Sequence, residues 1–149
     1  VQGDEPMTNP DDVLSVYQAM QRDTSCVLNC FCHITPLEKE MPSVPKVIVS
    51  ETKKLIYMSR GGIPFNKRME SRSNYKQVCI YGFGREHLQT VAKQKQKTEN
   101  EEIEDIEILR FVDLDIPVQM LQVSEGSIAV DTPEDLDRVR RIFEDKSEK

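Results

Sequence analysis

The sequence lacks any apolar run of about 18 residues, which argues against a membrane-spanning helix. It also lacks a surplus of basic residues, because 20 Lys and Arg stand against 26 Asp and Glu and leave a net charge of −6. Such a surface repels a phosphate backbone, and no local basic face offsets it, so we expect no nucleic-acid partner. An acidic protein that acts on anionic substrates must concentrate its few cations, or a metal ion, at one place.

A dinucleotide-binding glycine motif is lacking too. Residues 82–84 read GFG, but the third glycine of that motif is absent and the spacing fails. No internal repeat is present, and only residues 93–107, rich in Glu and Lys, have low complexity. A length of 149 residues suits one domain with a core of its own. We therefore treat residues 1–149 as a single domain.

Three of the four cysteines fall close together, at Cys26, Cys30 and Cys32, next to His33. In a strand over residues 25–34 these three thiols share one face while His33 points the other way. No second pair of ligands follows at zinc-like spacing. The pattern favours buried free thiols in a reducing cytoplasm over a metal site.

Apolar periodicity and turn residues predict helices that alternate with strands. Ile103, Ile106, Leu109 and Val112 form the clearest helical stripe, and a last helix buries a second one. This alternation predicts an α/β fold, with a mixed, mainly parallel sheet flanked by helices and one antiparallel hairpin. The expected helices cover residues 11–22, the stretch from 85 into 93–97, and the stretch from 133, where Leu136, Val139, Ile142 and Phe143 face the core. Asn9 is expected to cap the first of these helices, with Pro10 at its first helical position. The expected strands cover 25–34, 77–83, 118–123 and 127–130, with a hairpin of 46–49 and 54–58, and a loop over 61–75.

Two acidic residues stand out by position. Asp4 follows an apolar strand end, and Asp131 lies between a short apolar segment and a helix. Ligands of α/β sheets bind outside the carboxyl ends of the strands, and Mg²⁺ is usually held by one or two carboxylates, substrate phosphates and water. The two aspartates are therefore candidates for a shared metal site, although an Asp after a strand is more often a turn or cap residue.

Other polar residues are candidates for contacts with a ligand. Arg60 is followed by two glycines, where its guanidinium suits capture of a carboxylate; a surface ion pair is the alternative. Gln77 and Tyr81 share one face of their strand and point either to a ligand or to the core. Glu107 lines a site or lies on a solvated helix face.

The residues at the two chain ends resemble a known family. Residues 1–6 read VQGDEP, which is similar to the signature of the CMP-Kdo synthetases, also called 3-deoxy-manno-octulosonate cytidylyltransferases. Four further blocks follow in the family's order and extend the similarity over essentially the whole chain. These are PKVIV at 45–49, YMSRGGIP at 57–64, IYGF at 80–83 and VDTPEDL at 130–136.

The resemblance implies an incomplete Rossmann-like nucleotidyltransferase fold, in a homodimer. The implied reaction couples CTP to the acidic eight-carbon sugar Kdo, giving CMP-Kdo and pyrophosphate for lipopolysaccharide biosynthesis, with Mg²⁺ as cofactor. No nucleophilic side chain is required, because positioning and charge neutralisation carry the catalysis. By resemblance, Asp4 and Asp131 bind Mg²⁺, and Gln2, Arg60, Gln77, Tyr81 and Glu107 bind the sugar acid.

Two departures from the family pattern concern the acceptor. Gln77 stands where the family commonly has His, and Ile108 follows Glu107 where the family usually has Gln. Both positions lie at the sugar in the family. A related ulosonic acid, an amino-Kdo or a sialate-type acid, is therefore the alternative acceptor.

A third departure concerns the start of the chain. Family members open with a strand and a loop rich in Gly, Arg, Pro and Lys that binds CTP, whereas this chain begins at VQGDEP. We expect from this that the 149 residues alone do not turn over. A non-catalytic remnant that serves as an oligomerisation module is a further alternative.

Overall fold

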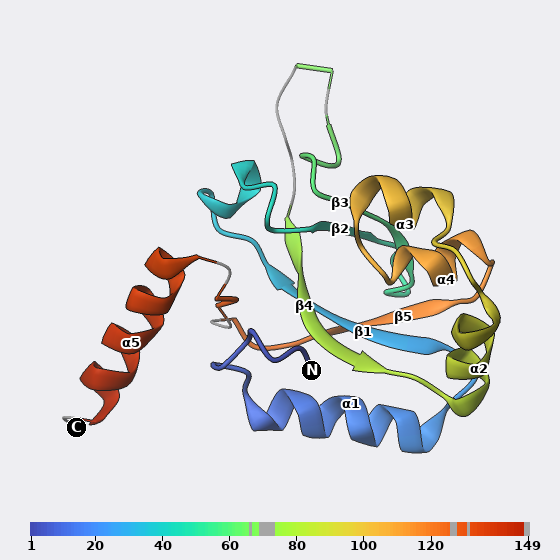
Figure 1. Ribbon diagram of the computed structural model, residues 1–149, viewed down its shortest axis with the longest axis horizontal. Coiled ribbons are helices and arrows are strands. Elements are labelled where there is room, and N and C mark those ends of the chain that lie inside the picture. Colours follow the sequence, from blue (N-terminus) through green and yellow to red (C-terminus); the bar gives the residue numbers. More distant parts are fainter. Residues whose placement is uncertain (66, 69–73, 126–127, 131, 148–149) are drawn as a thin grey trace.

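The computed structural model describes residues 1–65, 67–68, 74–125, 128–130 and 132–147. In this part of the chain a five-stranded sheet, in the order β3-β2-β4-β1-β5, lies between helix layers (Figure 1). None of the described helices is long and apolar enough to cross a bilayer. The helices are α1 (Pro10–Arg22), α2 (Arg85–Lys93), α3 (Glu99–Glu104), α4 (Leu109–Asp113) and α5 (Pro133–Ser147), with a 3₁₀ turn η1 (Glu38–Glu40). The strands are β1 (Val27–His33), β2 (Lys46–Val49), β3 (Leu55–Ser59), β4 (Tyr75–Gly82) and β5 (Val118–Gln122).

The sheet is mixed, which confirms the α/β class and the hairpin of β2 and β3. The expectation of a mainly parallel sheet is wrong for the described strands. Strand β1 is parallel to β5 but antiparallel to β4, and β2 is antiparallel to both β3 and β4. A parallel pair needs a long crossover, and the chain provides one between β1 and β5 by inserting β2, β3 and β4 between them.

Helix α1 covers one face of the sheet (Figure 1). The Asn9 side chain caps it by accepting a hydrogen bond from the Asp11 N–H at 3.1 Å, and Pro10 occupies the first turn, as predicted. Apolar residues of α1, β1 and β4 then form a buried cluster. Its members are Val16, Leu28, Cys30, Cys32, Val78 and Ile80.

The opposite face packs against the short helices α3 and α4 (Figure 1). The stripe over residues 103–112 does not form one continuous helix. Asp105 adopts the left-handed conformation, with φ 50° and ψ 50°, and ends α3 there. Ile106 and Leu109 are buried after this break, but Ile103 before it is 72% exposed. A backbone break rotates the two halves relative to one another, so the local spacing did not predict one buried face.

Helix α5 begins as predicted but does not bury the predicted face. The Thr132 hydroxyl and the Asp135 carboxylate exchange hydrogen bonds with each other's backbone N–H, which caps the helix. The helix then stands away from the sheet (Figure 1). Val139 is buried, whereas Leu136 is 37% and Phe143 48% exposed. The expected strand at 127–130 is also absent where it is described, at 128–130, and residues 94–97 are not helical.

All four cysteines are free thiols, as predicted. Cys30 and Cys32 are buried on the α1 side of β1, and His33 is exposed. The described residues contain no group of three or more metal-type ligands. Burial raises the pKa of Cys30 from 9.0 to about 12 and that of Cys32 to about 11. These thiols therefore stay protonated near neutral pH.

The shifted thiol pKa values predict that stability falls in base. Below pH 9 both thiols are protonated in the folded and the unfolded chain, so their contribution is constant. Between pH 9 and about 11–12 only the unfolded chain releases these protons, which lowers the free energy of unfolding by about 1.4 kcal/mol per pH unit for each thiol. The free energy of unfolding, measured in urea at pH 8.0, about 9 and about 10.5, should fall more steeply with pH than in the C30A/C32A variant. Equal slopes in the two proteins would contradict this account.

Candidate functional site

A cleft of about 470 Å³ runs along the edge of β4. The N-terminal segment, the connection between α3 and α4, and the start of α5 complete its walls. A second hollow of about 490 Å³, near the start of α1, is lined by none of the predicted site residues within the described chain. The β4 cleft is lined by all six predicted residues that the structure describes: Gln2, Asp4, Arg60, Gln77, Tyr81 and Glu107. Asp131 lies outside the described residues.

The N-terminal segment lies along β4 and places Asp4 at the cleft. The Gln2 N–H donates to the Cys79 carbonyl at 3.3 Å, and the Cys79 N–H donates to Glu5 Oε1 at 3.2 Å. The backbone carbonyl of Asp4 accepts from the Val130 N–H at 2.8 Å. The side-chain oxygen Oδ1 of Asp4 is buried and accepts no hydrogen bond from the described residues. An unpaired buried carboxylate oxygen is costly unless something else binds it.

A bulge in β4 shapes the floor of the cleft. Asn29 pairs with Tyr81 across the sheet, while the next residue of β1, Cys30, pairs with Val78. The two β4 residues between these partners therefore have no partner in β1. The buried Asn29 side chain donates to the carbonyls of Val78 at 3.1 Å and Ile80 at 3.0 Å, which replaces ladder bonds lost at the bulge. Bulges of this kind redirect side chains next to binding sites.

Gln77 and Tyr81 lie on the cleft side of β4 and contact each other. Gln77 Nε2 is 3.1 Å from Asn29 Oδ1 and 3.4 Å from the Tyr81 hydroxyl. Burial raises the pKa of Tyr81, and its neighbour Cys79 and the charge of Glu107 raise it further. Tyr81 is therefore a neutral phenol at physiological pH. Glu107 itself is exposed at the rim of the cleft.

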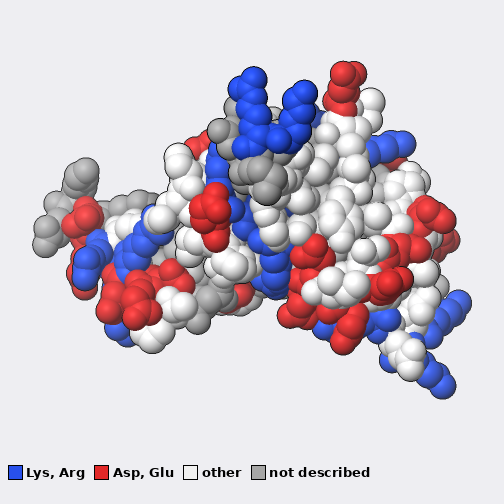
Figure 2. Space-filling view, turned by 90° about the horizontal axis from the view of Figure 1, so that it is seen from above, with Lys and Arg blue, Asp and Glu red and all other residues white. Residues whose placement is uncertain are grey.

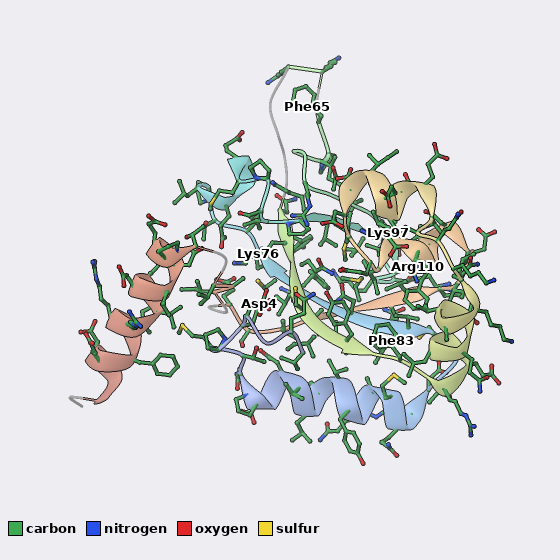
Figure 3. All side chains as sticks on the ribbon, viewed as in Figure 1. Asp4, Phe65, Lys76, Phe83, Lys97 and Arg110 are labelled. Carbon is green, nitrogen blue, oxygen red and sulfur yellow. The ribbon has the colours of Figure 1, made fainter. Side chains whose placement is uncertain are left out.

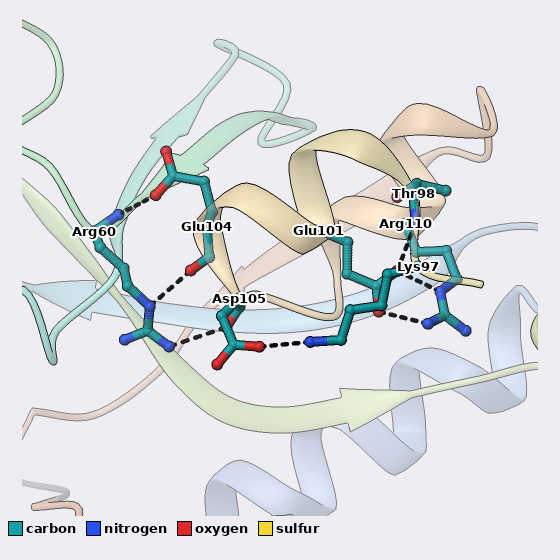
Figure 4. A network of polar contacts seen from close by, with 7 residues as sticks. All are labelled: Arg60, Lys97, Thr98, Glu101, Glu104, Asp105 and Arg110. Atoms are coloured by element: carbon teal, nitrogen blue, oxygen red, sulfur yellow. Dashed lines mark hydrogen bonds and ion pairs between the residues drawn. The ribbon is translucent and has the colours of Figure 1, made fainter.

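Arg60 holds the wall of the cleft together, and within the described residues it binds backbone carbonyls in place of the ion-pair partner that was one of its two alternatives. Its Nε and Nη2 atoms donate to the carbonyls of Glu104 at 2.7 Å and Asp105 at 2.9 Å, as Figure 4 shows. Its Nη1 atom donates to the Pro42 carbonyl at 3.2 Å. The guanidinium thus binds three backbone carbonyls, which are uncharged, and ties β3 to the end of α3.

The buried amine of Lys46 supports the same wall from the sheet side. Its Nζ atom donates to the carbonyls of Met41 at 2.6 Å and Arg60 at 2.8 Å. Burial lowers its pKa, with the positive charge of Arg60 adding to the effect. The guanidinium of Arg60 is thus bound on one side and its backbone carbonyl on the other, which leaves Arg60 with little freedom to move.

Sequence reasoning missed several charged residues that line the cleft. Lys76 pairs with Glu38, and Figure 3 shows Lys76 and Asp4 on the side of β4 that faces α5. Asp135 and Arg138 enter from α5. Asp135 stands near the end of the VDTPEDL block and Arg138 follows three residues later, and this helical spacing was the available signal. Figure 2 shows Lys and Arg side chains gathered at the centre of the face seen from above, flanked by acidic ones.

A comparison of the sequence with protein families decides the relationship. Residues 1–120 match the family model described as cytidylyltransferase. This chain belongs to the cytidylyltransferase family. The match covers β1 to β4 and most of the cleft, so the resemblance seen in the sequence blocks is confirmed.

Individual members of the family are similar over almost the whole chain. The 3-deoxy-manno-octulosonate cytidylyltransferase of Escherichia coli is 34% identical over 144 residues, which cover 96% of this chain and 58% of that protein. The enzyme of the same name from Syntrophus aciditrophicus is 30% identical over 146 residues, with the same coverage. The solved structure of CMP:2-keto-3-deoxy-manno-octonic acid synthetase complexed with CTP has a TM-score of 0.86 and 32% identity. The match covers 98% of this chain and 61% of that one, which confirms the fold.

Proposed function

We propose that the protein carrying this chain is a cytidylyltransferase that transfers CMP from CTP to Kdo, releasing pyrophosphate. The chain spans about 58% of the curated relatives that it matches, and we assign to it the part that binds the sugar acid. The observation that carries the proposal is the convergence of six separately predicted side chains on one cleft in a member of this family. The E. coli and S. aciditrophicus relatives are named for this reaction.

Asp4 and Asp131 are the proposed ligands of Mg²⁺. The buried, unpaired Oδ1 of Asp4 fits a cation ligand, because the ion would supply the missing partner. Val130, which precedes Asp131 in the sequence, donates its N–H to the Asp4 carbonyl, and this contact supports a shared site. When bound, Mg²⁺ supplies positive charge for the triphosphate. The Asp4 carboxylate, which lines the cleft, would hold that charge there.

The cleft residues then have distinct roles toward the sugar acid. Arg60 uses three of its five N–H groups on backbone carbonyls, and the two others remain for the carboxylate of the sugar. Tyr81, Gln77, Gln2 and Glu107 supply neutral and acidic contacts for hydroxyl groups. These contacts orient the anomeric hydroxyl, which attacks the α-phosphorus of CTP in line with the leaving pyrophosphate.

No side chain of the cleft needs to act as a nucleophile. Cys79 lines the cleft and contacts Tyr81, but burial raises its pKa to about 12, so it remains a thiol. The sugar hydroxyl therefore forms the new bond to the α-phosphorus, and the bond between that phosphorus and the pyrophosphate group breaks. The protein contributes positioning and charge neutralisation.

We further propose a homodimer in the cytoplasm. The exposed Leu136 and Phe143 of α5, which stands away from the sheet, favour a helix face covered by a second copy. Four free thiols favour a reducing compartment. The same exposed helix is the observation that favours the second candidate function, a non-catalytic oligomerisation module.

The deciding experiment measures pyrophosphate release by the protein that carries this chain. CTP, Mg²⁺ and one acceptor are supplied, and Kdo, an amino-Kdo and N-acetylneuraminate are compared as acceptors. Release that requires all three components, with Kdo preferred, supports the proposal. Release with the amino analogue or N-acetylneuraminate preferred would change the acceptor. Absence of release with every acceptor, together with dimer formation in sedimentation, would favour the oligomerisation module.

A further inference from the structure

The orientation of the buried Asn29 side chain is determined by its partners. Asn29 is 0% exposed, and one of its terminal atoms faces the carbonyls of both Val78 and Ile80. Carbonyl oxygens only accept hydrogen bonds, so the atom facing them must be the nitrogen Nδ2, which has two protons to donate. The oxygen Oδ1 must then point the other way, toward Gln77.

This orientation in turn determines that of Gln77. Asn29 Oδ1 carries no proton, so the atom of Gln77 that lies 3.1 Å from it must be the nitrogen Nε2. The second proton of Nε2 points to the Tyr81 hydroxyl at 3.4 Å. Both donors of the Gln77 amide are thus directed at the protein. Its oxygen Oε1 accepts no hydrogen bond from the described residues and is the polar atom left for the cleft.

We propose that Asn29 is a positioning residue that, through Gln77, gives the cleft a contact that only accepts hydrogen bonds. The sugar acid then places a donor, either a hydroxyl or an ammonium group, against Gln77 Oε1. This inference rests on the proposed function and specifies its acceptor further. A histidine, which the sequence resemblance leads us to expect here, can accept or donate according to its tautomer, whereas the Gln77 amide held by Asn29 cannot reverse.

The donor requirement separates two classes of acceptor. A neutral hydroxyl at this place forms an ordinary hydrogen bond, and an ammonium group forms a stronger, charge-assisted one. A sugar acid that offers a carbonyl or ether oxygen there places one hydrogen-bond acceptor against another, so that neither oxygen has a donor. The cleft should therefore bind sugar acids with a donor at this carbon more tightly than acids that differ only by lacking it.

Binding of a series of Kdo analogues to the protein that carries this chain tests the inference. Kdo, its singly deoxygenated, singly O-methylated and singly aminated derivatives are compared by calorimetry. At the carbon whose hydroxyl faces Gln77 Oε1, removal or methylation of that hydroxyl should weaken binding about tenfold. An amine at the same carbon should preserve or improve the affinity. In Q77L this difference should vanish, and in N29S it should shrink, while Q89L, at an exposed glutamine of α2, should retain it.

A double-mutant cycle distinguishes positioning from a purely structural role. If Asn29 acts through Gln77, N29S should change analogue preference in the natural background and leave it unchanged in the Q77L background. Unchanged preference in N29S would overturn the role of Asn29. An O-methylated derivative that binds like Kdo at every carbon would overturn the donor requirement. If no acid binds the unaltered protein, the inference and the proposed function both fail, whereas binding without this preference overturns the inference alone.

A measurement on the unaltered protein covers the case in which N29S does not fold. The side-chain amide protons of Gln77 should show nuclear Overhauser contacts to the Tyr81 ring both before and after Kdo binds. Loss of these contacts on binding would show that the Gln77 amide turns to donate to the ligand, and would overturn the proposal.

Discussion

Replacing Asp4 by Asn is expected to lower the rate of CMP transfer about 10²–10³-fold while leaving the fold intact. The substitution keeps the size of the side chain and removes the charge. The oxygen Oδ1 is buried and accepts no hydrogen bond from the described residues, so its proposed partner is the cation. Pyrophosphate release at increasing Mg²⁺ concentration should show a lower kcat and a higher apparent Mg²⁺ requirement.

A matched control for D4N is available at Asp115. This residue is exposed and has φ 56°, a left-handed conformation that Asn adopts as readily as Asp. D115N therefore removes one negative charge without a change of backbone strain, and its rate should equal that of the unaltered protein. A D4N protein that transfers CMP at the same rate as D115N would exclude Asp4 as a metal ligand.

Replacing Arg110 by Ala is expected to destabilise the protein by about 3–5 kcal/mol. Arg110 donates from Nε to Glu101 Oε2 at 2.6 Å and from Nη2 to Oε1 at 2.5 Å, and the Glu101 side chain is 1% exposed (Figure 4). Glu101 also accepts from the Thr98 N–H at the start of α3. Removal of the guanidinium leaves a buried carboxylate without its counter-charge. Urea unfolding near pH 7 measures the loss as a lower midpoint at unchanged slope.

Arg140 supplies the comparison for this effect. It lies 3.6 Å from Asp137 one turn earlier in α5, and both side chains are more than 60% exposed. An exposed pair of this kind contributes little, so R140A should lie within about 0.5 kcal/mol of the unaltered protein. The paired replacement E101L/R110M should recover much of the stability lost in R110A, because a packed apolar pair replaces the ion pair without leaving a charge. Equal midpoints for R110A and R140A would show that the buried pair contributes nothing.

The elements that the sequence predicted well are those whose evidence is local. Asn9 and Pro10 marked the start of α1, and runs of β-branched, aromatic and cysteine residues marked β1 and β4 to within two residues. Caps and strand composition depend on residues that are close in the chain, so the sequence alone shows them. The same holds for the free thiols of Cys30 and Cys32, which one strand face buries together.

Predictions that required a distant partner were less successful. The apolar face of α5 looked like a core face, but Leu136 and Phe143 are partly exposed because the helix stands away from the sheet. The stripe that contains Ile103 was divided by the left-handed Asp105. The surface ion pair offered as one alternative for Arg60 is not seen among the described residues, because its guanidinium binds carbonyls up to 45 residues away in the sequence. Backbone partners of this kind leave no trace in residue type.

The sequence by itself determined the family, through blocks at both chain ends, and indicated six of the residues that line the cleft. Only the tertiary structure decided that residues as distant as Gln2 and Glu107 share that cleft, and that the Gln77 amide is turned by Asn29. The physical reason is that chemical identity is carried by each residue alone, whereas the direction of a polar atom depends on hydrogen-bond partners that the sheet and its bulge bring together from elsewhere in the chain.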